Sequence, residues 1–418
     1  MTESWPVADD AIVLDIEKAI QPQIAGIEKV RQINAAKVLA AFQAERVGDS
    51  HFAASTGYAY GDLGRETLDR LFARVFGTEA ALVRSQIVSG THAIALCLYA
   101  LLRPGDELVC PTGAPYDTLA KVIGLGAPAP GSLAEFGVRY RQVELRPDGG
   151  FDAANIAASL TPAVKVVLIQ RSRGYSWRKA LSVREIGELI ELIKKDCPDV
   201  VCLVDNCYGE FTEAIEPSEV GADLVAGSLI KNPGGGLAPS GGYIAGKEEY
   251  VAAVADRLTA PGLGGEVGAS LSGHRLFYQG FYFAPHVVGE ALAGAVFTAE
   301  LFERLGFTVS PRPGDTRSDI IQAIQLGTPE RVIAFCQGIQ AGSPVDAFVA
   351  PEPWEMPGYS DPVIMAAGTF VQGASIELSA DAPLRPPYIV YLQGGLAREY
   401  SRLAILNAWS EMARRNIL

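Results

Sequence analysis

Short segments rich in β-branched residues alternate with amphipathic segments from residue 64 to residue 246, and this alternation constrains the fold more than any other feature. The short apolar segments predict strands at 79–83, 106–110, 138–144, 164–170, 200–205, 222–229 and 241–246. The segments between them predict helices at 64–77, 89–102, 115–124, 152–160 and 182–196. Such alternation is typical of an α/β protein with a mostly parallel sheet and helices on both faces. Ligands bind to such sheets beyond the carboxyl ends of the strands.

The regions that flank this α/β region have a different pattern. Residues 9–48 predict helix with a break near Gln21-Pro22, and the long helix packs either on its own domain or on another subunit. After residue 265 the pattern predicts a helix at 286–305, strands, a proline-rich stretch at 344–362 and a final helix at 396–415. We therefore expect an N-terminal helical segment (1–55), a large domain (56–265) and a smaller α+β domain (266–418) that closes over it.

The acidic composition restricts the partners of the protein. The chain has 418 residues and a net charge of -13, which argues against nucleic-acid and anionic-membrane partners. The N-terminal residues MTESWPVADD lack the features of a secretory signal, and the apolar stretches are far shorter than the roughly 20 residues that span a bilayer. The six cysteines lack the spacing of a disulfide framework or a metal site. We therefore expect a cytoplasmic protein with free thiols, no membrane span and no metal.

An aspartate and a lysine follow two of the predicted strands. Asp205 ends the apolar run VVCLVD, and Lys231 comes 26 residues later, after a second apolar strand and shortly before three glycines. A lysine at this edge is partly desolvated, which lowers its pKa and suits it to Schiff-base chemistry. A carboxylate that faces a pyridine nitrogen keeps that nitrogen protonated. Alone, Asp205 could be a turn residue and Lys231 a solvated loop residue; together they indicate a pyridoxal 5′-phosphate site.

Ser89, Gly90 and Thr91 open a predicted helix directly after a strand. The free N–H groups and the dipole of a helix N-terminus bind anions, so this segment suits a phosphate, although Ser89 could be only the helix N-cap. His92 in the first turn either contacts the ligand or packs in the interior.

Three tyrosines lie in loops that we expect near the same edge of the sheet. Tyr116 follows the strand at 106–110, where its ring either stacks on a cofactor ring or is a core or exposed residue. Tyr58 and Tyr60 lie in the glycine-rich loop STGYAYGDLG, which either contributes to the site or forms only a rigid turn.

The order of these segments resembles the fold-type I pyridoxal-phosphate enzymes of cysteine and methionine metabolism. The closer resemblance is to the methionine gamma-lyase-related group, also called the aluminium-resistance protein family, over about residues 57–396. It is carried by YAYGDLGRETLDRLFA, SGTHAI, IQRSRGY, VDNCYGEF, IKNPGGG, SIELSAD, RPPY and QGGL, of which VDNCYGEF with IKNPGGG is the most specific. The resemblance implies a transferase-like fold of type I and pyridoxal 5′-phosphate as the cofactor.

The resemblance also implies roles for single residues. Lys231 would form the Schiff base, Asp205 would pair with the ring nitrogen and Tyr116 would stack on the ring, which makes these three the catalytic residues. The phosphate would bind to Ser89, Gly90, Thr91 and Ser228, and to Tyr58 and Tyr60 of a neighbouring subunit. The sulfur-amino-acid lyases carry an arginine at the position of Tyr60 and a hydroxyl residue at that of Ile230. These departures concern the substrate and leave the cofactor assignment unchanged.

Four arginines are candidates for binding anionic groups. Arg171 and Arg173 follow the strand at 164–170, where either could bind the cofactor ring oxygen, the phosphate or a substrate carboxylate, or form a surface salt bridge; we select Arg173. Arg385 in LRPPY is our candidate for the substrate α-carboxylate, because a guanidinium binds a carboxylate bidentately. Arg398 is an alternative that we expect to face solvent on the last helix.

We expect an amino-acid lyase in which Lys231 removes the Cα proton and a β- or γ-substituent then leaves; carbon–sulfur elimination follows from the resemblance alone. Transamination, racemisation and aldol cleavage begin with the same steps and stay open, as does a non-catalytic stress-response role. A nicotinamide-dependent dehydrogenase is disfavoured because no G-x-G-x-x-G turn follows the first strand. We also expect a homo-oligomer, at least a dimer and by resemblance a tetramer, because the Tyr58 loop resembles one that crosses to a neighbour.

Overall fold

The computed structural model describes residues 11–126, 129–356, 359 and 361–418 of the chain. Its larger sheet has seven strands in the order β1-β7-β6-β5-β4-β2-β3. Their bounds are β1 (Ala80–Arg84), β2 (Glu107–Cys110), β3 (Arg139–Gln142), β4 (Val164–Gln170), β5 (Val201–Asp205), β6 (Leu224–Ser228) and β7 (Gly242–Gly246). The pairs from β6 to β3 are parallel, whereas β7 runs antiparallel to both β6 and β1. The expected mostly parallel sheet is therefore confirmed.

Helices cover both faces of this sheet. They are α3 (Leu63–Phe76), α4 (Gly90–Leu101), α5 (Asp117–Ile123), α6 (Ala153–Ser159), α7 (Val183–Asp196) and α8 (Glu248–Leu258). Successive strand residues point to opposite faces, so Val204 of β5 packs in a core with α3 and α7, whereas Leu203 packs in another with α4 and α8. A capping box fixes the start of α7, because Ser182 and Glu185 each accept a hydrogen bond from the backbone N–H of the other.

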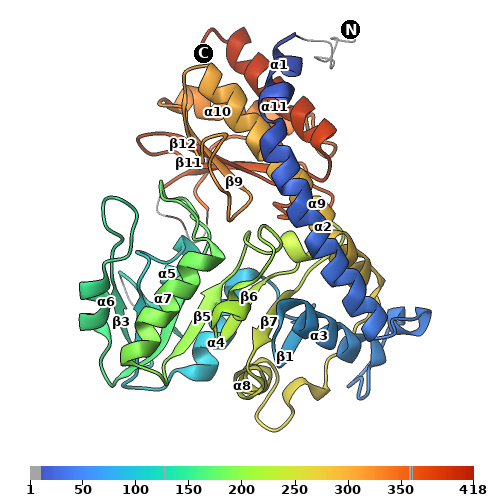
Figure 1. The fold of residues 1–418 in the computed structure, drawn as a ribbon, viewed down its shortest axis with the longest axis vertical. Coiled ribbons are helices and arrows are strands. Elements are labelled where there is room, and N and C mark those ends of the chain that lie inside the picture. The colour runs from blue at the N-terminus through green and yellow to red at the C-terminus, as the bar shows by residue number, and fades with distance from the viewer. Residues whose placement is uncertain (1–10, 127–128, 357–358, 360) are drawn as a thin grey trace.

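A second sheet lies above the first in Figure 1. Its five strands are all antiparallel and follow the order β10-β11-β12-β9-β8. Their bounds are β8 (Thr308–Ser310), β9 (Ile321–Gln325), β10 (Val363–Ala366), β11 (Ser379–Pro383) and β12 (Ile389–Gln393). Two helices, α10 (Pro329–Ala341) and α11 (Arg398–Arg414), lie on its far side from the first sheet (Figure 1). The boundaries that we expect for three domains stay a prediction.

Two long helices run side by side along both sheets (Figure 1). After α1 (Ala11–Ala19), α2 (Gln21–Ala44) packs against α9 (Arg275–Arg304), and the break near Gln21 is confirmed. Asn34 of α2 donates to the carbonyl groups of Phe211 and Glu213, so α2 packs on its own chain. The start expected for α9 at residue 286 is wrong, because the helix runs through Pro285 and its first turns are held by burial of Phe281 and its neighbours.

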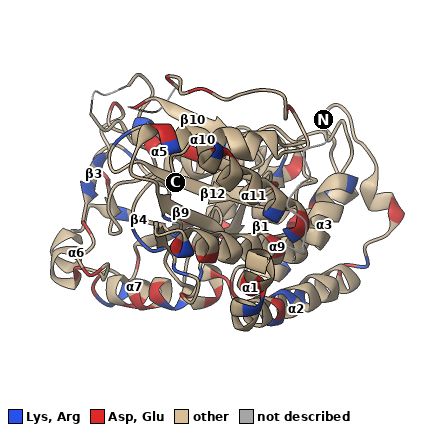
Figure 2. Cartoon of the chain, turned by 90° about the horizontal axis from the view of Figure 1, so that it is seen from above, with Lys and Arg blue, Asp and Glu red and all other residues tan. Residues whose placement is uncertain are grey.

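The described chain also contains the short 3-10 helices η1 (Asp49–Phe52), η2 (Pro217–Val220), η3 (Asn232–Gly234) and η4 (Gly264–Glu266). Figure 2 shows Asp and Glu interspersed with Lys and Arg on α2 and α7, so these helices present no surface of a single sign. Among the residues described, none of the helices combines the length and apolarity that crossing a membrane requires.

Candidate active site

Two neighbouring strands of the larger sheet end at one cavity. Asp205 is the last residue of β5 and pairs in register with Ala226 of β6. The chain turns after β6 and brings Lys231 close enough to Asp205 for each charge to affect the pKa of the other. Both side chains lie at the carboxyl ends of the parallel strands, where the sequence predicts them. The residues that line the cavity are Gly90, Thr91, Ile94, Tyr116, Leu119, Gln170, Ser172, Gly174, Asp205, Cys207, Tyr208 and Lys231.

The Lys231 ammonium group contacts an aromatic ring and has acidic neighbours. Its Nζ lies 3.9 Å from the centroid of the Tyr208 ring, which is a cation–π contact. Burial alone would lower the pKa of Lys231, but Cys207, Tyr208 and Asp205 raise it above its ordinary value. The expected lowering of this pKa is therefore wrong, because the acidic groups around the amine outweigh the effect of its burial.

The Asp205 carboxylate is oriented by the residue two positions later. Its Oδ1 accepts a hydrogen bond from the backbone N–H of Cys207 at 3.2 Å. Burial raises the pKa of Asp205, whereas Lys231 and the Cys207 hydrogen bonds act in the opposite direction. A buried carboxylate of this kind gains most from a cationic partner such as a protonated ring nitrogen.

The N-terminus of α4 faces the same cavity. Ser89 is the N-cap, and its Oγ accepts a hydrogen bond from the His92 N–H at 3.0 Å. Within the described part of the chain, the N–H groups of Gly90 and Thr91 donate to no other group. A side chain at Gly90 has no room, because a Cβ there would lie 2.9 Å from the Cys207 Sγ. Free N–H groups at a helix N-terminus suit an anion such as phosphate.

Tyr116 lies at the start of α5 and lines the cavity. Its backbone N–H donates to the Gln170 Oε1 at 2.8 Å, which ties the start of α5 to the end of β4. Its hydroxyl group is hydrogen-bonded to that of Tyr359, with 2.5 Å between the two oxygens. Burial raises the pKa of Tyr116 well above its ordinary value, so the phenol stays protonated at neutral pH.

Asp381 is an acidic residue near the cavity that the sequence analysis missed. It lies on β11 of the second sheet, and its Oδ2 accepts a hydrogen bond from the Gln393 Nε2 at 2.5 Å. Burial raises the pKa of Asp381 from 3.8 to about 7, although hydrogen bonds from Gln393 and Tyr175 and the charge of Lys231 act against this rise. The only signal in the sequence is that Asp381 ends the segment SIELSAD, which shows nothing of its proximity to Lys231.

The groups around the cavity fit pyridoxal 5′-phosphate. Lys231 supplies an amine for its aldehyde, Asp205 a carboxylate for its ring nitrogen, and Tyr116 a ring face. The free N–H groups of α4 supply a phosphate site, and they are the observation on which the fit depends. The cavity holds about 60 Å³ with Lys231 in contact with the Tyr208 ring.

Three predicted phosphate contacts lie outside the cavity lining. Ser228, the last residue of β6, is buried, and its Cβ would lie 3.5 Å from a Cβ at Gly90. Tyr58 and Tyr60 are 75% and 65% exposed, and their ring centroids lie 5.8 Å apart. In a single chain these two rings therefore face solvent, which leaves them free to contact another subunit.

The two arginines after β4 are both buried, which excludes the surface salt bridge considered for them. Arg171 donates to the Asn206 Oδ1 at 2.8 Å and to the Glu213 Oε1 at 2.9 Å. Arg173 donates to the Ser310 carbonyl at 2.8 Å and does not line the cavity. Arg171 therefore links residues of the segment that follows β5, whereas Arg173 binds the end of β8 in the second sheet.

The two arginines considered for the substrate carboxylate form ion pairs. Arg385 donates to the Asp361 Oδ2 at 2.9 Å and is partly exposed. Arg398 is the first residue of α11 and binds both carboxylate oxygens of Glu290. The expectation that Arg398 simply faces solvent is wrong, because Glu290 of α9 holds it in place.

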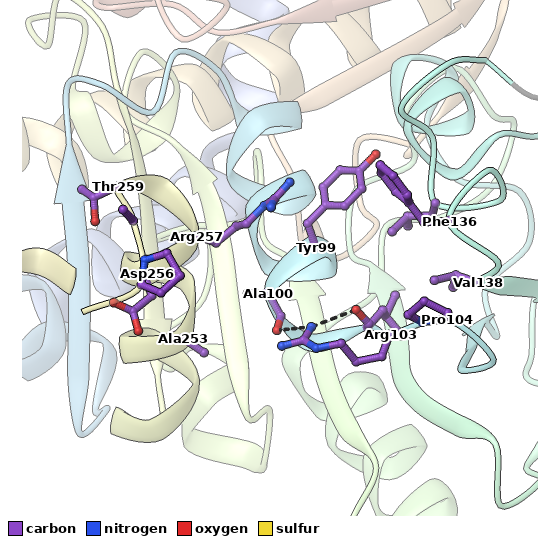
Figure 3. A pocket seen from close by; sticks show the side chains of 14 residues that line it. Tyr99, Ala100, Arg103, Pro104, Phe136, Val138, Ala253, Asp256, Arg257 and Thr259 are labelled. Carbon is purple, nitrogen blue, oxygen red and sulfur yellow. Dashed lines mark hydrogen bonds between the residues drawn. The ribbon is translucent and has the colours of Figure 1, made fainter. Parts of the chain in front are cut away.

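A wider cavity of about 720 Å³ lies at the other end of α4 (Figure 3). Figure 3 shows Tyr99 of α4 and Arg257 of α8 beside it, and the Arg257 guanidinium lies 5.2 Å from the centroid of the Tyr99 ring. The Arg103 side chain donates to the carbonyl groups of Ala100 and Leu102. None of the predicted site residues lines this cavity, so it is separate from the candidate active site.

A family profile and several known proteins match this chain over most of its length. Residues 10–413 match the family profile described as methionine gamma-lyase. The chain is 50% identical to the uncharacterized protein YnbB of Bacillus subtilis over 96% of both chains. It is also 48% identical to a solved carbon–sulfur lyase involved in aluminium resistance from Clostridium novyi, with a TM-score of 0.92 over 95% of this chain and 94% of the other. Identity to the L-methionine gamma-lyase of Pseudomonas putida is 31% over 52% of this chain and 49% of that protein.

Proposed function

The chain belongs to the methionine gamma-lyase family, and from that premise we propose that it releases a thiol from a sulfur amino acid by β- or γ-elimination. Its fold is that of the fold-type I enzymes, and its cofactor is pyridoxal 5′-phosphate. The family consists of lyases that act on carbon–sulfur bonds. The observation that carries the proposal is the meeting of Lys231, Asp205 and Tyr116 at one cavity with the α4 N-terminus.

Each of these groups has a separate task in the proposed reaction. Lys231 holds the cofactor aldehyde and, once released by the substrate, accepts the Cα proton on its Nζ. Asp205 holds the ring nitrogen in its protonated form, and the N–H groups of Gly90 and Thr91 bind the phosphate. Tyr116 orients the ring and faces the leaving group. Pyridoxal phosphate, when bound, supplies the electron sink for the pair that the Cα–H bond releases.

We extend the proposal to residues that complete the site from elsewhere. Tyr58 and Tyr60 of one subunit contact the phosphate in another, in a homo-oligomer that is at least a dimer and, by resemblance, a tetramer. Ser228 and Arg173 contribute from behind the cavity, and Arg385 binds the substrate α-carboxylate after leaving Asp361. The exposure of Tyr58 and Tyr60 supports the shared site, and free, mostly buried cysteines support a cytoplasmic location.

The proposal is tested by assaying thiol and keto-acid release from methionine, cystathionine and cysteine. We expect the wild type to release both products from at least one of them, and Lys231→Ala to release neither. Lys165→Ala is the matched control, because this exposed β4 lysine donates, among the residues that the structure describes, only to the Pro162 carbonyl. Transfer of the amino group to a keto acid without thiol release would overturn the lyase assignment in favour of an aminotransferase.

A further inference from the structure

A cavity of about 460 Å³ lies between α2, α9 and the loops at 212–214 and 314–317. The two helices run side by side along both sheets (Figure 1). Small-molecule sites typically hold roughly 300–1,000 Å³, so this cavity has room for a ligand. None of the residues predicted for the active site lines it, so it is separate from the cavity at Lys231.

Arg317 lines this cavity and is almost fully buried. The residue is 8% exposed, and its Nη2 donates to the Gln322 Oε1 at 2.7 Å and to the Ala295 carbonyl at 3.5 Å. Its Nε and Nη1 are also buried, and neither donates to any group in the described part of the chain. Burial and the neighbouring Arg173 lower the pKa of Arg317 to about 10, so the guanidinium still carries its charge at neutral pH. Buried arginines are ordinarily paired, because an isolated buried charge is unfavourable.

Three carboxylates lie near this guanidinium or in the cavity wall, but none forms an ion pair with it among the described residues. Asp319 Oδ2 instead accepts a hydrogen bond from the Arg173 backbone N–H at 3.2 Å, and Glu213 Oε1 accepts one from the Arg171 Nη2 at 2.9 Å. Asp315 lines the cavity, is exposed, and pairs with no cation in the chain as described. The cavity therefore has both an unpaired positive charge and an unpaired negative charge.

The amide of Gln23 in α2 lies beside the same loop. A Cβ at Gly314 would lie 4.0 Å from the Gln23 Nε2, which places this amide next to the segment that carries Asp315 and Arg317. The Gln23 Oε1 is buried and accepts no hydrogen bond from the residues that the structure describes. A buried acceptor without a donor is costly, so a ligand that donates a hydrogen bond there would be stabilised.

The remaining wall of the cavity is largely apolar. Ile27 and Val30 of α2 and Leu292 and Val296 of α9 line it, and the two α9 residues are buried. A wall of this kind favours a ligand with a hydrocarbon part, because apolar surface is removed from water on binding. Inorganic phosphate or sulfate would match the guanidinium but leave this wall without a partner.

We propose that this cavity binds an α-amino acid with an apolar side chain, whose carboxylate pairs with Arg317 and whose ammonium group is bound by Gln23 and Asp315. The hydrocarbon side chain packs between α2 and α9. A carboxylate without an amine would leave Gln23 and Asp315 unmatched, and an amine without a carboxylate would leave Arg317 unmatched. The site does not depend on the proposed lyase reaction, because it shares no residue with the cavity at Lys231.

The probe is L-leucine, whose side chain is apolar and carries no leaving group. Reduction of the holoenzyme with borohydride first fixes the cofactor on Lys231, so that the active site cannot capture the amino group. Isothermal titration calorimetry of this protein should show leucine bound at one site per chain. 4-Methylpentanoate lacks the ammonium group of leucine and 3-methylbutylamine lacks its carboxylate, so each should bind at least about tenfold more weakly.

Two variants locate the site. Arg317→Gln removes the charge but keeps an amide that can donate to Gln322, and it should weaken leucine binding about 10- to 100-fold. Gly26→Leu tests the place instead of the charge: Gly26 lines the cavity, and a Cβ there meets nothing within 4 Å, so the new side chain competes with the ligand without a clash. Ala36→Leu is the matched control, because Ala36 is an exposed residue of α2 outside the cavity. It should bind leucine like the wild type.

Thermal unfolding with and without leucine separates lost binding from lost stability. Leucine should raise the Tm of the wild type and of Ala36→Leu, but not that of Gly26→Leu or Arg317→Gln. A wild type that binds no leucine at millimolar concentration, or Gly26→Leu that binds it as tightly as the wild type, would overturn the site. Equal binding of leucine and 4-methylpentanoate would overturn the assignment of an amino acid. None of these results bears on thiol release, which tests the lyase function separately.

Discussion

The Nζ of Lys231 lies 3.9 Å from the centroid of the Tyr208 ring. This contact favours the charged form of the lysine. Cys207, Tyr208 and Asp205 also favour that form and raise the pKa of Lys231 despite its burial. Formation of a Schiff base requires the neutral amine, so the ring that holds the ammonium group also slows capture of the cofactor. When pyridoxal phosphate binds, Lys231 therefore loses its contact with the Tyr208 ring and forms the Schiff base instead.

Removing the Tyr208 ring should make Lys231 easier to deprotonate. A cation–π contact of about 1 kcal/mol corresponds to a pKa change of about 0.7 units, so Tyr208→Leu should take up added pyridoxal phosphate several-fold faster at neutral pH. Stopped-flow absorbance measures this uptake. Tyr208→Phe keeps the ring and should behave like the wild type; slower uptake by Tyr208→Leu would show that the ring helps to bind the cofactor instead.

Neutralising Asp205 should weaken cofactor binding. A hydrogen bond to a charged group contributes about 1.5–3 kcal/mol, so Asp205→Asn should bind pyridoxal phosphate about 10- to 100-fold more weakly. Equilibrium dialysis gives the dissociation constants. Asp205→Glu retains the charge and should lose less affinity; an unchanged constant for Asp205→Asn would remove this residue from the cofactor site.

A methyl group at the N-terminus of α4 should disturb the phosphate site. A Cβ at Gly90 would lie 2.9 Å from the Cys207 Sγ, and overpacking of this kind costs about 1–3 kcal/mol. Gly90→Ala should therefore lower affinity for the cofactor about tenfold, and adding Cys207→Ala should restore part of it. Gly26→Ala in α2 is the control, because its Cβ would meet nothing within 4 Å. Additive losses in the double variant would contradict the clash.

Asp381 should give the wild type a pH dependence of stability that Asp381→Asn lacks. The unfolded chain releases this proton near pH 3.8, whereas the folded chain holds it up to about pH 7. The folded state binds more protons in this window, so the contribution of Asp381 to stability is full below pH 3.8 and is lost as pH rises to about 7 and beyond.

Urea unfolding of both proteins across this range measures the effect as a difference between their free energies of unfolding. The comparison with Asp381→Asn is needed because burial also raises the pKa of Glu210, to about 8, and that residue titrates in both proteins. A difference that stays constant with pH would show that Asp381 is ionised throughout.

The pair Asp205 and Lys231 was predictable because the signal is local. Each follows an apolar run long enough to be a buried strand, and parallel strands that neighbour each other bring their carboxyl ends to the same edge. The same reasoning predicts that the N-terminus of α4, which follows β1, and Tyr116, which follows β2, lie at this edge.

Asp381 and the start of α9 could not be predicted in this way. Asp381 reaches the site because one sheet closes over another, and no spacing within the chain encodes that approach. Pro285 ordinarily marks a helix boundary, but burial of Phe281 and Tyr278 stabilises the turns before it. The raised pKa of Lys231 also depends on Tyr208, whose position over the amine follows from a turn rather than from a strand.

The most direct test of the account is to reduce the purified holoenzyme with borohydride and locate the bound pyridoxyl group by peptide mass spectrometry. We expect a visible absorption band that borohydride removes, with the label on the peptide that contains Lys231. Lys231→Ala should lack both the band and the label. A label on another lysine, or wild-type protein that takes up no pyridoxal phosphate, would contradict the central claim.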